Sequence, residues 1–372
     1  MKKVIYVVES FGSGVYTFLT QLSNSVVESY EVVIIYSVRK ETPENFKNDF
    51  NSEIKFIQID MCRGLNPFKN IKALLQLKKI LKKEKPHIIH LHSSIAGFLG
   101  RITCYANRFD MEKVFYNPHG FSFLQQNESK FKRKLFYGLE WFASRLGGFT
   151  VGCSLGELEE ALKISEKCIN INNGIDTNKL DVIIDENYLK TNYSIINKSE
   201  NNNKLKIGTV GRICYQKNPE LFNDIAKSFA EYDFIWIGDG ELKYKLLADN
   251  IKVTGWSDRK EVIKELMDID IFILTSLWEG LSISLLEAMY LGKPVIVTNV
   301  IGNKDVINNN INGYIVNDLN EYIKTINNIT KNNIISDVKF KEKVKFNIID
   351  KYGQMQMVEK YMDLYELKRK KY

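Results

Sequence analysis

The chain has 372 residues, more than one typical domain, so two domains are expected. Hydrophobic residues make up 44% and charged residues 26%, a balance typical of a globular protein and not of a disordered one. The net charge of +7 does not require a nucleic-acid partner, and none is expected. Five scattered cysteines without a C-x-x-C pair disfavour a disulfide or zinc framework and indicate a reducing compartment.

The first residues, MKKVIYVVESFGSG, predict a buried strand over Val4–Val8. This apolar run is too short for the core of a signal peptide. Nowhere does the sequence contain the run of about 18 apolar residues that a membrane-spanning helix needs. A cytoplasmic protein is therefore expected.

A glycine-bearing loop follows this strand, and helical spacing begins at Val15. Strand, glycine loop and helix in this order open a Rossmann-like unit. The dinucleotide fingerprint is incomplete, because Thr17 stands where a third small residue is needed and no acid follows the next strand, Val32–Tyr36. A nicotinamide-dependent oxidoreductase is thus disfavoured. We expect the loop backbone to approach a ligand at Gly12, Ser13 and Gly14.

Strands and helices keep alternating through the first half of the chain. Further strands are predicted over Lys55–Ile59, His87–His92, Lys113–Asn117, Thr150–Cys153 and Ile169–Asn172. A lysine-rich helix is predicted over Pro67–Lys83, with a buried face made of Ile71, Leu74, Leu75, Leu77 and Leu81. A second helix, Lys130–Leu146, is basic at its start and rich in aromatic residues.

The alternation of predicted strands and helices ends after Asp176 and begins again at Lys206. Strands are then predicted over Lys206–Val210, Phe234–Ile237, Ile251–Thr254, Ile271–Leu274, Pro294–Thr298 and Gly313–Val316, and helices over Pro219–Phe229, Glu241–Asp249 and Lys260–Met267. The fold class is therefore α/β, with two Rossmann-like, doubly wound parallel-sheet domains facing each other across a cleft. The predicted parts are an N-terminal domain 1–184, a linker or irregular insertion 185–203, a C-terminal domain 204–345, and helices 346–372 that pack back toward the N-terminal domain.

The stretch Ile271–Lys293 combines a buried strand, a polar loop and a helix that begins near Ser282. Glu279 in the loop and Glu287 on the helix can accept hydrogen bonds from hydroxyls. The helix amides near Leu281 favour an anion. This combination suits a ligand that carries both phosphates and sugars.

Two cations, Arg212 and Lys217, follow the first strand of the second half, on the same ligand side of the predicted sheet. They can stabilise a departing diphosphate without a metal. The only D-x-D sequence considered as a metal site, Asp268–Ile269–Asp270, begins a strand at the opposite edge, so a metal-independent site is expected.

All four histidines, His87, His90, His92 and His119, fall within 33 residues. The spacing of His90 and His92 would allow an H-x-H metal pair, but no acidic ligand accompanies it. We therefore expect these histidines to be buried or to line a cleft. His119 follows a strand end and precedes a glycine. It is predicted to be functional, as a neutral imidazole that orients a hydroxyl.

These motifs together resemble the retaining GT-B glycosyltransferases of family 4. The run Glu279–Gly280–Leu281–Ser282 with Glu287–Ala288–Met289 resembles the family's E-x7-E signature, and Val210–Gly211–Arg212 with Lys217–Asn218–Pro219 resembles its phosphate loop. The glycine loop at Gly12–Gly14, the run Asn173–Asp176, and Gly238–Asp239–Gly240 with Gly255 also match. The segments HSSIAGFLGR and NPHGFSF resemble the subset found in bacterial capsule, exopolysaccharide and O-antigen pathways.

The resemblance implies a role for each matching residue. Glu279 and His119 would lie at the donor sugar and the attacking hydroxyl, and Glu287 would bind the ribose. Arg212 and Lys217 would stabilise the diphosphate. The other implied donor-binding residues are Gly12, Ser13, Gly14, Gly238, Gly240, Gly280, Leu281 and Ser282. The Gly-Ser-Gly loop departs from the family's glycine pair. Ser284 stands where many relatives have a different small residue or a nearby proline, so the identity of the donor sugar does not follow from this position.

The implied activity is a retaining hexosyl transfer from a nucleotide-sugar, by default a UDP-sugar, to a growing surface polysaccharide. No cofactor or metal is expected. The acceptor would be a polyprenyl-diphosphate-linked sugar at the inner face of the membrane, and the basic helices suggest peripheral contact with anionic lipid. A sugar-nucleotide epimerase of the same fold stays open. So does a non-catalytic partner subunit, although the intact charged residues speak against it.

Overall fold

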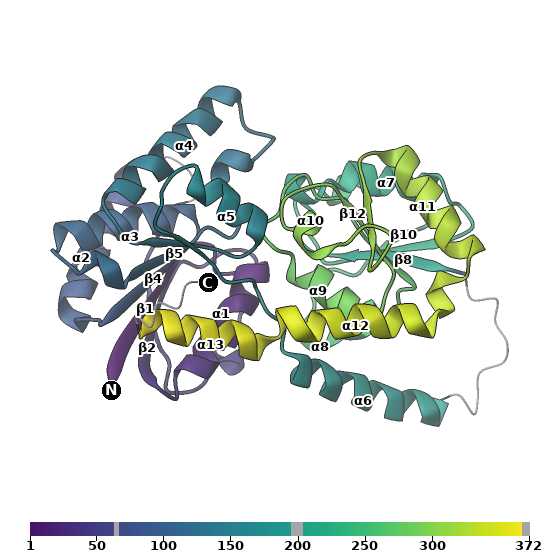
Figure 1. Ribbon diagram of the computed structural model, residues 1–372, viewed down its shortest axis with the longest axis horizontal. Coiled ribbons are helices and arrows are strands. Elements are labelled where there is room, and N and C mark those ends of the chain that lie inside the picture. The colour runs from purple at the N-terminus through teal and green to yellow at the C-terminus, as the bar shows by residue number, and fades with distance from the viewer. Residues whose placement is uncertain (63–66, 195–203, 367–372) are drawn as a thin grey trace. The chain divides into compact units, whose positions relative to one another are not determined.

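The computed structural model describes residues 1–62, 67–194 and 204–366, which form two compact units (Figure 1). The first unit consists of Met1–Asn173 and the segment that begins at Gln354. The second unit is Gly174–Gly353. The chain thus returns to its first unit after completing the second.

The first unit is built on a seven-stranded, all-parallel sheet with the order β3-β2-β1-β4-β5-β6-β7. Its strands are β1 Lys2–Val8, β2 Tyr30–Tyr36, β3 Lys55–Gln58, β4 Ile88–His92, β5 Val114–Asn117, β6 Phe149–Gly152 and β7 Cys168–Asn170. Continuous apolar runs form these central strands because helices cover both faces of the sheet. The order reverses between β1 and β4, which makes their carboxyl ends a favoured ligand position.

Helices of the first unit divide between the two faces of its sheet. Their bounds are α1 Ser13–Val26, α2 Pro67–Glu84, α3 Ser94–Ala106, α4 Lys130–Arg145, α5 Leu155–Leu162 and α13 Gln354–Tyr365. Helix α3 packs between α2 and α4, whereas α13 packs against α1 (Figure 1).

The second unit repeats this design with six parallel strands in the order β10-β9-β8-β11-β12-β13. They are β8 Lys206–Val210, β9 Asp233–Ile237, β10 Ile251–Val253, β11 Ile271–Leu274, β12 Val295–Thr298 and β13 Tyr314–Val316. Its helices are α6 Thr177–Ser194, α7 Pro219–Lys227, α8 Arg259–Met267, α9 Ile283–Tyr290, α10 Asn303–Val306, α11 Leu319–Lys331 and α12 Val338–Tyr352. Here the strand order reverses between β8 and β11. The predicted two parallel sheets are confirmed.

The predicted linker 185–203 differs from the structure over its first half. Helix α6 continues to Ser194 and belongs to the second unit, while 195–203 lie outside the described residues. Leu180 and Ile183 are buried, and Asp181 accepts a hydrogen bond from Tyr290 at 2.8 Å. These contacts, together with packing against α8, hold α6 in the second unit, so its polar composition was a poor guide to its structure.

Two further sequence predictions are wrong. On α2, Leu77 and Leu81 are buried as expected, but Ile71 and Leu75 are exposed, because the helix buries a narrower face that includes Ala73. Over the predicted helix 241–249 only Lys243–Lys245 form a 3-10 turn. There Asn223 accepts hydrogen bonds from two backbone amides of the segment, which favour a loop over helical pairing.

A buried polar network fastens α13 to the first sheet. The Tyr365 hydroxyl lies 2.6 Å from His90 Nδ1, and the Tyr361 hydroxyl donates to Asn117 Oδ1 at 3.1 Å. All four side chains are buried. The expected return of the C-terminal helices to the first unit is therefore seen for α13, whereas α12 packs on α9 in the second unit.

Replacing Tyr365 by Phe removes the partner of His90 Nδ1 and leaves a buried polar atom unpaired. We expect a loss of about 1–3 kcal/mol in the free energy of unfolding, measured by denaturant titration. Tyr105 is exposed on α3, and Tyr105→Phe is the matched control. Equal stability of the two variants would contradict the role given to the network.

Candidate functional site

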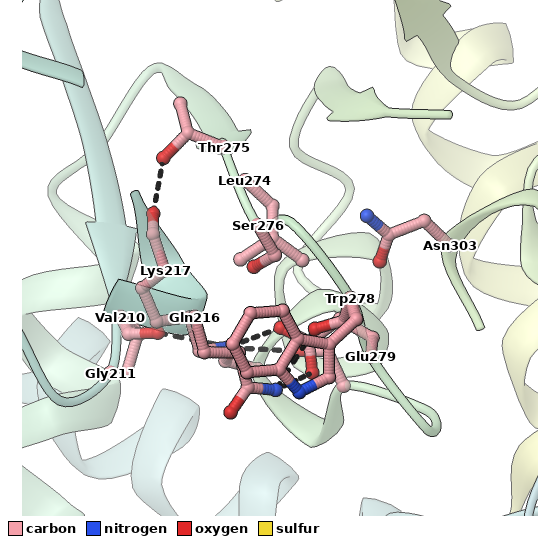
Figure 2. A network of polar contacts seen from close by, with 12 residues as sticks. Val210, Gly211, Gln216, Lys217, Leu274, Thr275, Ser276, Trp278, Glu279 and Asn303 are labelled. Atoms are coloured by element: carbon pink, nitrogen blue, oxygen red, sulfur yellow. Dashed lines mark hydrogen bonds and ion pairs between the residues drawn. The ribbon is translucent and has the colours of Figure 1, made fainter. Parts of the chain in front are cut away.

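The loops at the switch point of the second sheet collect most of the predicted donor-binding residues. Strands β8 and β11 are neighbours, so the loop that begins at Gly211 and the loop that begins at Thr275 leave the sheet side by side. Thr275 Oγ1 donates to the backbone oxygen of Lys217 at 2.6 Å and ties the loops together (Figure 2). Open α/β sheets bind ligands at such positions.

An ion pair between Lys217 and Glu279 lies at the centre of these loops (Figure 2). Lys217 Nζ is 2.7 Å from Glu279 Oε1, and the carboxylate is buried. Gln216 Nε2 donates to the backbone oxygen of Trp278 at 2.9 Å and lies 3.4 Å from Glu279 Oε2. Both carboxylate oxygens thus face donors, so Glu279 is held in one position with its charge compensated.

Glycines let the loop backbones pack without side chains between them. Gly238 has φ +137°, and a Cβ there would lie 2.3 Å from the backbone oxygen of Gly211. A Cβ on Gly240 would lie equally close, at 2.3 Å, to the backbone oxygen of Ile213. The structure therefore places both predicted glycines against the loop that carries Arg212 and Lys217.

The start of α9 completes this group of loops. Ser282 occupies the N-cap position, but its hydroxyl pairs with Ser284 Oγ at 3.0 Å and does not cap the helix. Ser284 Oγ also donates to the backbone oxygen of Val210 at 3.3 Å, which ties α9 to the end of β8. Gly280 and Leu281 lie in the preceding loop, as predicted.

Glu287 is buried on α9 and forms an ion pair with Arg259 at the start of α8. Its Oε2 atom has no hydrogen-bond partner among the described residues. A buried carboxylate oxygen without a donor is costly, which makes it a ready acceptor for a ligand hydroxyl. Arg259 was missed by sequence reasoning, because nothing in its local sequence distinguishes it from a solvated helix cation.

Arg212 stands apart from the Lys217–Glu279 pair. Its Nη2 atom is 3.6 Å from Glu241 Oε1, and the guanidinium is partly exposed. A half-exposed pair of this length contributes little to stability. Arg212 lies in the same loop as Lys217, at the carboxyl end of β8.

Gly302 is a second position that sequence reasoning missed. Its φ is +83°, and a Cβ would lie 2.3 Å from the Gly280 backbone oxygen and 3.2 Å from Glu279 Cβ. Only glycine fits here, so Gly302 at the start of α10 fixes the path of the Glu279 loop. A glycine in the short loop after the buried strand β12 was the available signal.

In the first unit, Gly12, Ser13 and Gly14 form the start of α1 at the carboxyl end of β1. A Cβ on Gly12 would lie 2.9 Å from Glu41 Cβ, whereas a Cβ on Gly14 would meet nothing within 4 Å. Gly14 is exposed, and contact between its backbone and a ligand stays a prediction.

His119 follows β5 in the left-handed conformation, with φ +53°. Its Nε2 atom is 3.0 Å from His92 Nδ1, and the Phe18 ring packs edge-on at 4.9 Å between ring centroids. Burial lowers the pKa of His119 to about 3, so the ring is neutral at pH 7. The ring lies at the carboxyl end of β5, and its role in catalysis stays a prediction.

The loop that carries His119 is held by Glu157, a buried carboxylate on α5. Its two oxygens accept hydrogen bonds from the amides of Gly120 at 2.6 Å and Cys153 at 2.8 Å. Sequence reasoning missed this residue. The signal was the S-x-x-E pattern of Ser154 and Glu157, since Ser154 Oγ does cap the Glu157 amide.

The Asp268–Ile269–Asp270 sequence is structural, as expected. Asp270 Oδ2 accepts from the Lys206 amide at 2.8 Å, and Asp268 Oδ2 lies 2.5 Å from Lys206 Nζ. These contacts lie at the amino end of β8, away from the loops at its carboxyl end. In the part of the chain that the structure describes, no group of three or more histidine, cysteine or acidic side chains could hold a metal ion.

Comparison with known proteins decides the family. A family model described as "Glycosyl transferase 4-like" matches residues 3–145, and one described as "Glycosyl transferases group 1" matches residues 193–346. A protein of Escherichia coli, UDP-Gal:alpha-D-GlcNAc-diphosphoundecaprenol alpha-1,3-galactosyltransferase, is 31% identical over 328 residues, covering 82% of this chain and 81% of that protein. The chain belongs to the family 4 glycosyltransferases.

Other relatives of this family 4 glycosyltransferase agree with the assignment. The capsular polysaccharide biosynthesis glycosyltransferase CapM of Staphylococcus aureus is 26% identical over 308 residues, covering 78% of this chain and 77% of CapM. The solved structure of Anabaena HepE in complex with UDP-glucose has a TM-score of 0.75 at 14% identity, covering 99% of this chain and 100% of HepE. The GT-B fold and the capsule or O-antigen type of glycosyltransferase are therefore established.

Acid should destabilise this glycosyltransferase through its buried histidines. Burial lowers the pKa of His90 to about 3, so between about pH 6.5 and 3 the unfolded chain binds protons that the native state does not. Stability present above pH 6.5 is then lost as the pH falls. The thermal midpoint should be lower at pH 5 than at pH 7.5.

His90→Gln should weaken this pH dependence, because it removes a titrating group from the core. His87→Gln, at an exposed position outside the core, is the comparison variant. A pH dependence that is the same in all three proteins would argue against the buried neutral histidine.

Proposed function

We propose that this glycosyltransferase transfers a hexose from a UDP-sugar to a polyprenyl-diphosphate-linked sugar, with retention of the anomeric configuration. The observation that carries the proposal is the Lys217–Glu279 pair beside the start of α9, at the switch point of the second sheet. The cation and the helix start there can bind a diphosphate, and the carboxylate beside them can bind the sugar that it carries.

The charges of this group suit a diphosphate that arrives and leaves. Without a ligand, Glu279 neutralises Lys217 across 2.7 Å. A bound diphosphate would compete for the ammonium group, and Arg212 would add a second cation. Negative charge grows on the diphosphate as the bond to the sugar breaks, so these cations stabilise the transition state more than the ground state.

The two acids serve hydroxyls in this proposal. Once Lys217 turns to phosphate, Glu279 can accept hydrogen bonds from the donor sugar. Glu287 offers its unpaired Oε2 atom to the ribose, while Arg259 holds the other oxygen.

The reaction proceeds without a protein nucleophile in the route that the family favours. The bond between the sugar C1 and the diphosphate oxygen breaks, and the acceptor oxygen forms its bond to C1 from the same face. The acceptor proton passes to the departing phosphate oxygen. His119 orients a hydroxyl. Because burial lowers its pKa to about 3, its imidazole is a weak base and takes no part in the proton transfer.

The acceptor is inferred from a relative. The Escherichia coli relative is named for a sugar-diphosphoundecaprenol acceptor. We propose the same class of acceptor for this chain, at the cytoplasmic face of the membrane. Among the described residues, no helix is long and apolar enough to cross a bilayer.

A basic and apolar surface on α4 supports peripheral contact with anionic lipid. Phe131 is 78% exposed, and Trp141 and Phe142 are also exposed. Lys130 and Lys134 are exposed on the same helix. Aromatic rings can enter the lipid headgroup layer while the lysines contact anionic headgroups.

Enzyme assays with UDP-galactose and a GlcNAc-diphospholipid acceptor test the proposal. The wild type should form an α-linked product, identified by NMR, and should keep its activity in EDTA. Glu279→Gln should lower kcat by roughly 10²-fold or more, because a contact at the reacting sugar is lost. Lys217→Met should weaken donor binding and also lower kcat, because the lost cation acts most strongly on the departing diphosphate, whereas Lys227→Met on the exposed side of α7 should change neither constant.

Three outcomes would contradict parts of the proposal. Conversion of the donor to its epimer without acceptor would identify an epimerase. Binding of the donor without turnover of any UDP-, GDP-, ADP- or dTDP-sugar would point to a non-catalytic partner subunit. Activity lost in EDTA and restored by magnesium would show a metal requirement.

Vesicle sedimentation tests the α4 surface. The triple change Lys130→Gln, Phe131→Ser and Lys134→Gln should release the protein from phosphatidylglycerol vesicles, and wild-type binding should weaken at high salt. Lys339→Gln with Lys343→Gln, at exposed positions of α12, is the charge-matched control. Unchanged partitioning of the triple variant would exclude this surface as the membrane contact.

A further inference from the structure

Three histidine rings follow one another through the first unit, from the buried sheet to the loop after β5. The ring centroids of His90 and His92 are 4.2 Å apart, and His92 Nδ1 is 3.0 Å from His119 Nε2. His90 and His92 are fully buried, and His119 is half-buried. The protonation of His90 and His92 is therefore set by their neighbours and not by water.

His90 has a defined proton position. Asn117 Nδ2 donates to the Val151 backbone oxygen at 2.9 Å, which fixes the amide so that Asn117 Oδ1 faces His90 Nε2 at 2.6 Å. An amide oxygen only accepts, so His90 carries its proton on Nε2. The Tyr365 hydroxyl can then donate to His90 Nδ1.

Among the residues that the structure describes, His92 has one hydrogen-bond partner for its two nitrogens. Burial lowers its pKa well below the ordinary value, so the ring is neutral and carries a single N–H. Its Nε2 atom is buried and has no partner among the described residues, and the Tyr6 and Phe18 rings pack close by. Orphaned buried N–H groups are rarer than under-satisfied acceptors, which favours a proton on Nδ1.

We propose that His92 is a positioning residue that donates from Nδ1 to His119 Nε2 and so fixes the proton of His119 on its Nδ1. His119 then presents an N–H donor, and not a basic nitrogen, to a hydroxyl or phosphate oxygen of the substrate. The use of this donor in catalysis rests on the proposed function. The tautomer itself does not.

Nitrogen NMR of the ligand-free protein labelled with ¹⁵N-histidine tests the tautomer directly. The chain holds only four histidines, so each ring can be assigned from single variants. The wild type should show His119 protonated on Nδ1 and bare on Nε2. In His92→Phe this pattern should change to a mixture of tautomers, whereas His92→Asn, whose amide can donate from the same position, should restore it.

His87→Asn, at an exposed position, should leave the His119 signals unchanged. A wild-type His119 protonated on Nε2 would overturn the proposal, even if His92→Phe does not fold. So would a folded His92→Phe protein with unchanged His119 signals.

Turnover separates this inference from the proposed function. If His119 orients the substrate, His92→Phe should lower kcat by roughly 10- to 100-fold with little change in the donor KM, and His92→Asn should recover most of it. A changed tautomer with unchanged kcat would leave the positioning role of His92 intact. It would remove His119 from the reaction.

Discussion

The ion pair between Lys217 and Glu279 is the interaction on which the second unit's site depends. Both groups come from loops at the carboxyl ends of neighbouring parallel strands, β8 and β11. The positions of these two loops are fixed by contacts of Gln216, Thr275 and Gly302. A charged pair held in this way is a poor source of stability but a good receptor for an anion, which can replace one partner by competition.

The first unit also has polar loops at the carboxyl ends of its strands, with an ion pair between Glu9, directly after β1, and Arg39. At its own switch point the α1 start leaves space at Gly14, and the loop after β5 holds His119 in a left-handed conformation. Glu157 secures this loop through backbone amides, and buried rings hold the imidazole neutral. Both arrangements grow from the same strand–loop–helix pattern.

Much of this was readable from the sequence, because strand-end loops follow from short-range patterns. The E-x7-E spacing placed Glu279 in a loop and Glu287 on a helix, as the structure shows. The partners of these acids were less predictable, since Arg259 comes from a different helix and only the folded chain brings it to Glu287. Helix α6 was missed because a few long-range contacts, such as Asp181 with Tyr290, outweigh its polar composition.

The central claim is that Lys217 binds the diphosphate of the donor. Calorimetric titration of the intact protein with UDP and with uridine measures this directly, because the two ligands differ only in the diphosphate. We predict that UDP binds far more tightly than uridine to the wild type, and that Lys217→Met removes most of this difference while uridine binding stays the same. A difference between UDP and uridine that persists in Lys217→Met would contradict the account.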